Sequence, residues 1–313
     1  MQIKGSRFLV IGGAGFIGSH TCISLLDSNH KLIILDNFSN SSPLVLDRIK
    51  KLAKDPNITD DTFLIKEGDV RNKKFLENIF DEFINKNQPI EGVIHFAGLK
   101  SVQESINDPT SYWDINVNGT LTLLKVMKRY DCKVMVFSSS ATIYGSSDIV
   151  PIPENAPIKP LNPYGNTKAA IEKLLSDIAG CSDSQSICSS SKSSWRIARL
   201  RYFNPVGAHP SGLIGEDPIG TPNNLFPFLT QVAIGRQKLL KVFGDDWNTN
   251  DGSGIRDYIH IIDLAEGHLA SLDYLNSKDS CLEFINLGSG KGYSVFQIIR
   301  QFELSTGCKI PFS

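Results

Sequence analysis

The sequence has few cysteines, no excess of either charge and no long apolar run. Its 313 residues include six cysteines, none at C-x-x-C spacing, which argues against a zinc site or a disulfide framework, and we expect no metal. The 32 basic and 33 acidic residues give a net charge of −1 without a basic block, so no nucleic-acid partner is expected. No stretch approaches the roughly 18 apolar residues of a membrane span, and the first apolar run begins too early for a signal peptide to precede it. We therefore expect a cytoplasmic protein without a membrane partner.

The sequence does contain a string of glycines between an apolar run and a helical pattern. Gly12, Gly15 and Gly18 follow the β-like run at residues 8–11 and lead into residues 19–26. A diphosphate at a helix N-terminus meets unpaired N–H groups and the positive end of the helix dipole, and side chains at these positions would block it. The order of strand, glycines and helix predicts a dinucleotide-binding turn, although a glycine string can also mark only a loop.

Asp36 supports the dinucleotide interpretation. It follows directly on the next apolar run, residues 31–35, about twenty residues after the glycines. An acid at this place accepts hydrogen bonds from the adenosine ribose hydroxyls, and its charge repels a 2′-phosphate. We therefore expect NAD rather than NADP as the cofactor.

Short β-like runs alternate with longer helical patterns. The β-like runs occupy residues 8–11, 31–35, 62–65, 92–97, 133–137, 196–203 and 283–287, and the helical patterns occupy 75–83, 111–130, 162–178 and 262–275. This alternation predicts an α/β fold with a doubly wound, Rossmann-like parallel sheet, which binds ligands at the carboxyl ends of its strands. We expect residues 1–203 to form the dinucleotide-binding domain, residues 204–313 a smaller C-terminal substrate lobe, and residues 256–287 to pack back onto the first domain.

A tyrosine, a lysine and a group of hydroxyls have the chemistry of a proton-transfer site. Tyr164 and Lys168 are four residues apart and share one face of a predicted helix. A free phenol has a pKa near 10, but a neighbouring ammonium and the positive ring of an oxidised nicotinamide favour the phenolate. Tyr164 then serves as the base for a substrate hydroxyl, and the run at residues 138–142, with three serines and a threonine at the end of a β-like run, supplies a hydroxyl that orients the reacting carbon. Taken alone, the Tyr/Lys spacing can also be an exposed helix face, and serines after a strand can be turn chemistry.

Several motifs resemble the extended short-chain dehydrogenase/reductase superfamily. They are the glycine spacing at residues 12–18, the His-Phe-Ala-Gly sequence at residues 95–98 and the Tyr164-x-x-x-Lys168 pair. Longer runs at residues 18–21, 95–100, 116–120, 138–145, 201–210 and 254–260 resemble the UDP-glucose 4-epimerase family within it. The similarity covers nearly the whole chain except the Ser-rich stretch at residues 180–194, which we interpret as a surface loop without a functional role.

The resemblance implies two sets of ligand contacts. NAD would contact Gly12, Gly15, Phe16, Ile17, Gly18, Asp36, Asn37, Phe38, Ser39, Asn40, Ser41, Asp69, Val70, Phe96, Ala97, Gly98, Leu99, Lys100, Asn116, Ser140, Tyr164, Lys168 and Phe203. A UDP-sugar would contact Ser140, Tyr164, Asn204, Asn224, Leu225, Lys241, Val242, Phe243 and Arg256. Arg256 has an independent rationale, because a guanidinium suits a pair of diphosphate oxygens, and its alternative is a surface ion pair with Asp257.

The activity implied by the resemblance is the interconversion of UDP-glucose and UDP-galactose. Tyr164 takes the proton of the sugar 4-hydroxyl while the C4 hydride moves to NAD, and the 4-keto sugar takes both back on its opposite face. A related sugar-nucleotide dehydratase is disfavoured, because Ala141 and Thr142 stand where that family has Asp-Glu. A second alternative is an NAD-binding protein without catalysis.

The resemblance also concerns assembly and length. Family members form homodimers through two helices, which here correspond to residues 111–130 and 162–178. The family continues beyond the point that matches residue 313 with further diphosphate and ribose contacts, so we expect a substrate lobe that is incomplete at its C-terminus. A small-molecule substrate and a second copy of the chain are the partners expected.

Overall fold

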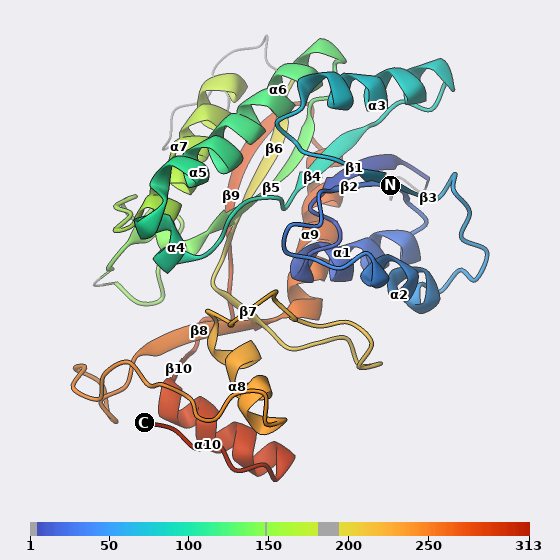
Figure 1. Cartoon of the computed structure of the whole chain (residues 1–313). Coiled ribbons are helices and arrows are strands. Elements are labelled where there is room, and N and C mark those ends of the chain that lie inside the picture. Colours follow the sequence, from blue (N-terminus) through green and yellow to red (C-terminus); the bar gives the residue numbers. More distant parts are fainter. Residues whose placement is uncertain (1–4, 148, 181–193) are drawn as a thin grey trace.

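The computed structural model describes residues 5–147, 149–180 and 194–313. Within these residues the chain forms a central sheet covered by helices on both faces, and a smaller lobe lies below the sheet in the view of Figure 1. The Ser-rich stretch expected as a surface loop at residues 180–194 lies, apart from its two end residues, outside the described residues.

The central sheet in the described part of the chain has seven strands, all parallel. Their order across the sheet is β3 (Phe63–Glu67), β2 (Lys31–Asp36), β1 (Arg7–Ile11), β4 (Gly92–His95), β5 (Val134–Ser140), β6 (Arg196–Tyr202) and β9 (Cys281–Leu287). The order switches direction between β1 and β4, and in such sheets ligands bind at the carboxyl ends of the strands on either side of the switch. The predicted doubly wound parallel sheet is confirmed.

Alternate residues of each strand feed two separate apolar cores, because successive side chains point to opposite faces. On β1, Phe8 and Val10 belong to the core under α1 (Phe16–Asp27), α2 (Leu44–Leu52) and α9 (Ile261–Asn276). Leu9 and Ile11 belong to the core under α3 (Lys73–Asn85), α6 (Gly119–Arg129) and α7 (Pro163–Ala179). Figure 1 shows the two groups of helices on opposite sides of the sheet. Cover on both faces explains why β1 is buried throughout.

The helical stretch expected at residues 111–130 is interrupted. The chain forms α4 (Val102–Asn107), α5 (Pro109–Tyr112), the π-helical turn η1 (Trp113–Asn118) and then α6. The wide turn carries the buried side chain of Asn116, which bonds to Leu99 and Thr167. Turns of this kind are frequent at functional sites. Periodicity does not reveal it, because one wide turn hardly changes the pattern of apolar residues.

The smaller lobe has its own sheet and core. β7 (Asn204–Val206), β8 (Ile255–His260) and β10 (Gly292–Ser294) form a three-stranded sheet in the order β10, β8, β7. α8 (Leu225–Ala233) and α10 (Val295–Thr306) enclose a core around Leu229, Leu240 and Ile299. Between β8 and β10 the chain returns to the central sheet as α9 and β9 (Figure 1). The sequence does not predict α8, because Pro227 within it argues against a helix.

Candidate active site

The glycine turn brings backbone segments together where side chains do not fit. Gly12 has a φ of +80°, and a Cβ there would lie 2.7 Å from the amide nitrogen of Ala97. A Cβ at Gly18 would lie 2.3 Å from the carbonyl oxygen of Gly12. Gly15 precedes α1 in an extended conformation and offers no side-chain cap, so the first N–H groups of α1 suit an anionic ligand.

Asp36, the last residue of β2, joins the glycine turn to the loop at residues 37–41. One carboxylate oxygen accepts a hydrogen bond from the amide of Ala14 (3.0 Å), and the other accepts from the amide of Phe38 (2.9 Å) and the hydroxyl of Ser41 (3.1 Å). Phe38 has a φ of +54°, an uncommon conformation for a bulky residue. Strain of this kind clusters at ligand sites. The predicted cofactor loop is therefore ordered by Asp36.

The loop after β4, residues 96–100, connects the glycine turn with α7. Ala97 meets Gly12, and a Cβ at Gly98 would lie 3.8 Å from the Nζ of Lys168. The ring of Phe96 packs against that of His268, with centroids 4.9 Å apart. The predicted cofactor residues and the Tyr/Lys helix thus belong to one continuous site.

Asn116 holds this loop in place. Its Oδ1 accepts from the amide of Leu99 (2.8 Å), and its Nδ2 donates to the carbonyl oxygen of Leu99 (3.1 Å) and to the hydroxyl of Thr167 (3.1 Å). The side chain is 1% exposed. The resemblance implies that Asn116 contacts NAD, whereas the structure gives its amide protein partners and a role in fixing the loop against α7.

Asp69 and Val70 follow β3 and face the start of α6. The carboxylate of Asp69 accepts from the amide of Arg71 (2.8 Å), and the guanidinium of Arg71 lowers the pKa of that carboxyl. Arg71 also pairs with Asp114 of η1. Val70 is buried, and a Cβ at Gly119 would lie 2.8 Å from its Cγ1. Asp69 is therefore a fixed negative charge at the carboxyl edge of the sheet.

The predicted catalytic residues meet at the end of β5. Lys168 is 4% exposed, and its Nζ donates to the carbonyl oxygen of Ser138 (2.7 Å) and lies 6.0 Å from the centre of the Tyr164 ring. Ser140 ends β5, and its hydroxyl shares a 2.8 Å hydrogen bond with that of Thr142. The side chain of Ser140 lies close enough to Tyr164 to lower the pKa of its phenol. The structure thus brings Ser140, Tyr164 and Lys168 together.

Burial dominates the electrostatics of this trio. It raises the pKa of Tyr164, and the side chain of Ser140 lowers that pKa in part. Burial also lowers the pKa of Lys168 to about 8, and the carboxylate of Glu172 opposes this shift. In the protein alone the pKa of Tyr164 therefore moves away from neutrality, opposite to the direction expected when an ammonium and an oxidised nicotinamide act on it together.

Two predicted cofactor residues lie where the lobes join. The ammonium of Lys100 pairs with the carboxylate of Glu216 (2.8 Å) in the segment that precedes α8. Phe203 lies between β6 and β7, and its amide donates to the carbonyl oxygen of Leu287 (3.0 Å). A Cβ at Gly288 would lie 2.8 Å from the Phe203 ring. These contacts bring both residues to the junction between the central sheet and the smaller lobe.

The polar substrate residues predicted on the smaller lobe bond within that lobe. The side-chain amide of Asn204 donates to the carbonyl oxygen of Asp257 (2.7 Å), and that of Asn224 donates to the carboxylate of Glu216 (2.8 Å). Arg256 donates to the carbonyl oxygen of Ile255 (2.7 Å). The alternative ion pair between Arg256 and Asp257 is not formed, because the Asp257 carboxylate accepts hydrogen bonds from the loop at residues 289–290.

The remaining predicted substrate residues divide into two kinds. Leu225 and Val242 pack against the core of the smaller lobe. Lys241 is exposed, and Phe243 is 87% exposed. A phenyl ring so exposed gains contacts only from a ligand or from movement of its loop. Within the described residues, no hydrogen bond joins any of the substrate residues predicted on the smaller lobe to Tyr164 or Lys168.

Two acids at the site, Glu172 and Glu216, were not among the predicted residues. Glu172 is 1% exposed, lies four residues after Lys168 on α7 and pairs with Arg201 of β6. Glu216 bonds to both Lys100 and Asn224. The signal for Glu172 was its helical spacing from Tyr164 and Lys168, which places all three on one face. For Glu216 only the tertiary contacts provide a signal.

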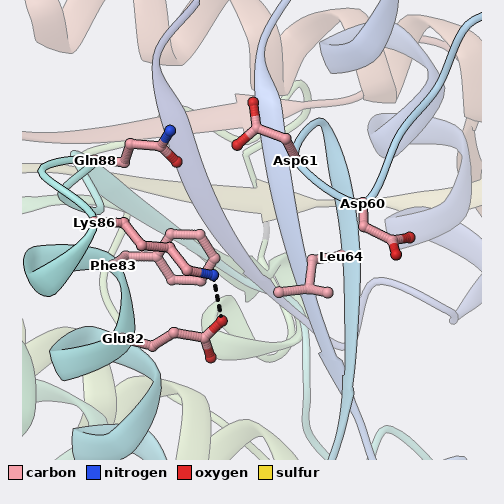
Figure 2. Close-up of a pocket in the computed structure, with 7 residues that line it drawn as sticks. All are labelled: Asp60, Asp61, Leu64, Glu82, Phe83, Lys86 and Gln88. Carbon is pink, nitrogen blue, oxygen red and sulfur yellow. Dashed lines mark hydrogen bonds and ion pairs between the residues drawn. The ribbon is translucent and has the colours of Figure 1, made fainter.

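A pocket of about 430 Å³ lies at the opposite end of the strands, close to Asp61, Glu82, Phe83, Lys86 and Gln88 (Figure 2). Two of the three carboxylates that line it are ion-paired within the protein: Asp61 with Arg7 and Lys31, and Glu82 with Lys66 and Lys86. Ligands of open α/β sheets bind at the carboxyl ends of the strands, whereas this pocket lies at the amino end of β3. We therefore place the site at the carboxyl edge.

In the described ranges of the chain, no group of three or more His, Cys, Asp or Glu side chains is arranged to hold a metal ion. Nor is any helix in those ranges long and apolar enough to cross a membrane.

A family described as the NAD dependent epimerase/dehydratase family matches residues 8–288. The chain is 48% identical to UDP-glucose 4-epimerase 2 of Arabidopsis thaliana over 303 residues, which cover 97% of this chain and 81% of that protein. It is 46% identical to UDP-glucose 4-epimerase of Bacillus subtilis over 305 residues, 97% of this chain and 83% of that protein.

Solved structures give the same result. The UDP-glucose 4-epimerase from Bifidobacterium longum, crystallised with NAD+ and UDP, superposes with a TM-score of 0.88 at 44% identity, over 98% of this chain and 85% of that one. The enzyme from Stenotrophomonas maltophila, with bound NAD and formylated UDP-arabinopyranose, superposes with a TM-score of 0.88 at 42% identity, with the same coverage of both chains.

Proposed function

The chain belongs to the NAD-dependent epimerase/dehydratase family, and on that premise we propose that it interconverts UDP-glucose and UDP-galactose, with NAD as its cofactor. It is then an isomerase of carbohydrate metabolism. The observation that carries this function is the meeting of the glycine turn, the loop at residues 96–100 and the Tyr164/Lys168 pair at one edge of the sheet. Relatives of that activity match 97% of the chain.

The carboxyl edge fits a dinucleotide. The glycine turn and the uncapped N-terminus of α1 would hold the diphosphate, and Asp36 would accept hydrogen bonds from the adenosine ribose. The loops at residues 37–41 and 96–100, together with Phe203, would contact the remainder. When bound, NAD accepts a hydride from the sugar C4 and returns it.

Tyr164 moves the proton that accompanies this hydride. Its phenolate accepts the proton of the sugar 4-hydroxyl as the C4–H bond breaks, and returns it to the oxygen when that bond forms again on the opposite face. The reaction is balanced, since each bond that breaks is later restored. Because burial raises the pKa of Tyr164, the phenolate depends on positive charge nearby, which Lys168 supplies and an oxidised nicotinamide increases. Ser140 orients the hydroxyl.

We assign the UDP-sugar to the smaller lobe. Arg256 would bind the diphosphate, because its planar guanidinium matches two oxygens at once. The other predicted contacts are Asn204, Asn224, Leu225, Lys241, Val242 and Phe243. Asn224 and Lys100 share Glu216 in the structure, so the two lobes are already in contact beside the site.

Elimination of water, a second reaction of the same family, is disfavoured by the residues after β5. That reaction needs an acid and a base beside the sugar, and the matching positions lie on the short helix η2 (Ala141–Tyr144). Ala141 has no polar side-chain atom, and the hydroxyl of Thr142 is bonded to that of Ser140. Neither side chain can transfer a proton at neutral pH.

The test is an assay of the purified chain with UDP-galactose and NAD, coupled to oxidation of the UDP-glucose formed. Conversion is expected. Folded protein that binds NAD without conversion would support the non-catalytic alternative, and formation of a 4-keto-6-deoxy sugar would support a dehydratase.

The remaining proposals concern assembly and organisation. We propose a homodimer through η1, α6 and α7, on which Val117, Leu174 and Ile178 are only partly buried. Light scattering should give twice the 34.5 kDa of one chain. We keep residues 1–203 as the dinucleotide-binding domain and residues 204–313 as the substrate lobe; of the stretch 256–287 expected to pack back onto the first domain we keep α9 and β9 there, because residues 256–260 lie in β8 of the lobe sheet. A cytoplasmic location is supported by the free thiols of Cys22, Cys132, Cys281 and Cys308, and cell fractionation tests it.

A further inference from the structure

α7 presents three polar side chains to β5 at four-residue spacing: Tyr164, Lys168 and Glu172. Each lies beside one of residues 138–140. Lys168 donates to the carbonyl oxygen of residue 138 (2.7 Å), and Glu172 accepts from the hydroxyl of Ser139 (2.5 Å). Tyr164 lies beside Ser140, whose side chain lowers the pKa of the phenol. Helical spacing aligns the three side chains, and the end of β5 gives them consecutive partners. The proposed mechanism uses the first two and leaves Glu172 unexplained.

The carboxylate of Glu172 is buried but fully paired. Arg201 of β6 reaches both of its oxygens, with Nε 3.0 Å from Oε1 and Nη2 2.6 Å from Oε2. A nitrogen of Arg199 lies 3.7 Å from Oε2. A paired guanidinium and carboxylate have defined relative positions, because both groups are planar. Burying such charges is costly, so a role in stability alone does not account for the pair.

The network continues from Arg201 into the rest of the sheet. Its Nη1 donates to the hydroxyl of Tyr144 (2.7 Å) and to the carbonyl oxygen of Glu154 (2.7 Å). The Tyr144 hydroxyl donates in turn to the side chain of Asn286 on β9 (2.7 Å). Glu172 therefore connects α7 to β5, β6, η2 and β9 through hydrogen bonds alone.

We propose that Glu172 is a positioning residue for the reaction. By holding the hydroxyl of Ser139 against α7, it fixes the register between that helix and the end of β5, and with it the placement of Ser140 and Lys168 around Tyr164. This inference rests on the proposed function. It assigns the residue a task in turnover rather than only in packing, because a small slip of β5 along α7 would separate the two hydroxyls that must both meet the sugar.

Glu172 also balances the charge around Lys168. On β4, His95 lies near Lys168 and is neutral, because burial lowers its pKa to about 3. On β6, Arg199 and Arg201 are paired with Glu172. Removing the negative charge leaves three buried cations close together, which disfavours the ammonium of Lys168. The pH above which turnover falls should then move downward.

The experiment compares Glu172→Gln and Glu172→Asp with the wild-type protein. For Glu172→Gln we expect kcat to fall about 10- to 100-fold, the scale for a misplacement of about 1 Å, while KM for UDP-galactose changes little. The alkaline limb of the rate profile should move to lower pH. Glu172→Asp restores the charge but not the reach, so its alkaline limb should return to the wild-type position with only partial recovery of kcat. NAD content after gel filtration should be unchanged in both variants.

Glu77→Gln is the matched control, because Glu77 of α3 is also buried and ion-paired, with Arg129 at 2.6 Å, but contacts none of the residues of the proposed mechanism. Folded Glu172→Gln with the kcat and pH profile of Glu77→Gln would overturn the inference. If Glu172→Gln does not fold, Ser139→Ala decides, because it removes one hydroxyl only, and an unchanged kcat there is equally negative. Inactive wild-type protein would instead overturn the proposed function, so the two failures are distinguishable.

Discussion

The two sides of the site differ in how completely the protein itself arranges them. On the sheet side, Lys168 and Asn116 are buried and bonded to neighbouring backbone. On the lobe side, Arg256 and Lys241 are exposed, and Phe243 is 87% exposed. Chemistry benefits from groups that are in position before the substrate arrives, since ordering them then costs nothing during the reaction. Binding groups on a lobe can instead be ordered by the ligand, at some cost in affinity.

The apolar cores beneath the two sides differ in size, and the larger cores lie on the sheet side. The central sheet separates two extensive cores, whereas the smaller lobe surrounds a core of only a few buried residues centred on Leu229 and Ile299. Regions with few buried apolar contacts open more readily. The lobe should therefore exchange amide hydrogens faster than β1, β4 and β5. Substitutions on the sheet side should thus reduce turnover, and those on the lobe side should weaken substrate binding.

The largest effect is expected from Tyr164→Phe. This variant keeps the ring and removes the proton carrier, so kcat should fall by at least ~10²-fold, the usual scale for a positioned acid–base group. NAD should stay bound, as absorbance and gel filtration can show. Tyr130→Phe, which removes a distant hydroxyl bonded to Asp81, should leave kcat unchanged. Near-normal turnover by Tyr164→Phe would refute the assigned role.

The next effect tests the glycine turn. In Gly18→Ala the added Cβ would lie 2.3 Å from the backbone oxygen of Gly12, so the turn must open, at a cost of about 1–3 kcal/mol in stability. NAD affinity should fall with it, as titration calorimetry can measure. Gly254→Ala is the control on the other lobe, because the nearest atom to its Cβ would be 3.7 Å away. Equal NAD affinity in the two variants would contradict the role of the glycine turn in binding the diphosphate.

A smaller effect, of the opposite kind, is expected from Arg256→Gln. Loss of a charge-assisted contact worth roughly 1.5–3 kcal/mol should raise KM for UDP-galactose about 10- to 100-fold and change kcat less. Arg256→Lys should lie between, because it keeps the charge and loses the fork. Arg236→Gln, another exposed arginine of the same lobe, serves as control. A fall in kcat without a rise in KM would contradict the assignment of Arg256 to substrate binding.

The smallest effect concerns stability against pH. The pKa of Lys168 is lowered from 10.5 to about 8, so between these values the unfolded chain holds a proton that the folded chain has lost. The destabilisation from the buried ammonium is complete below pH 8 and is relieved as the pH rises toward 10.5. The melting temperature should therefore gain roughly 2–4 °C for each kcal/mol relieved. Lys168→Met should lose this gain, and a wild-type melting curve equal to that of the variant at every pH would contradict it.

Much of the fold could be predicted because its signals are local. The β-like runs at residues 8–11 and 31–35 lie within β1 and β2, and the helical pattern at residues 162–178 lies almost wholly within α7. α8 could not be predicted, because Pro227 within it is typical of a helix break. The helix is stabilised by packing into the core of the smaller lobe, which the sequence does not reveal. The wide turn η1 was missed for a related reason: it is stabilised by bonds from Asn116 to other elements rather than by a sequence pattern.

The sequence by itself determined the glycine turn, the acid that ends β2 and the Tyr/Lys face of α7, because each depends on residues whose spacing along the chain sets their spacing in space. Only the tertiary structure decided that Asn116 holds Leu99, 17 residues away, and that Glu172 pairs with Arg201, 29 residues away. It also decided that the pKa of Tyr164 rises in the protein alone, since that depends on how completely other elements exclude water from the phenol. Spacing along a helix records which side chains are neighbours, whereas burial and long-range pairing exist only once the elements have packed.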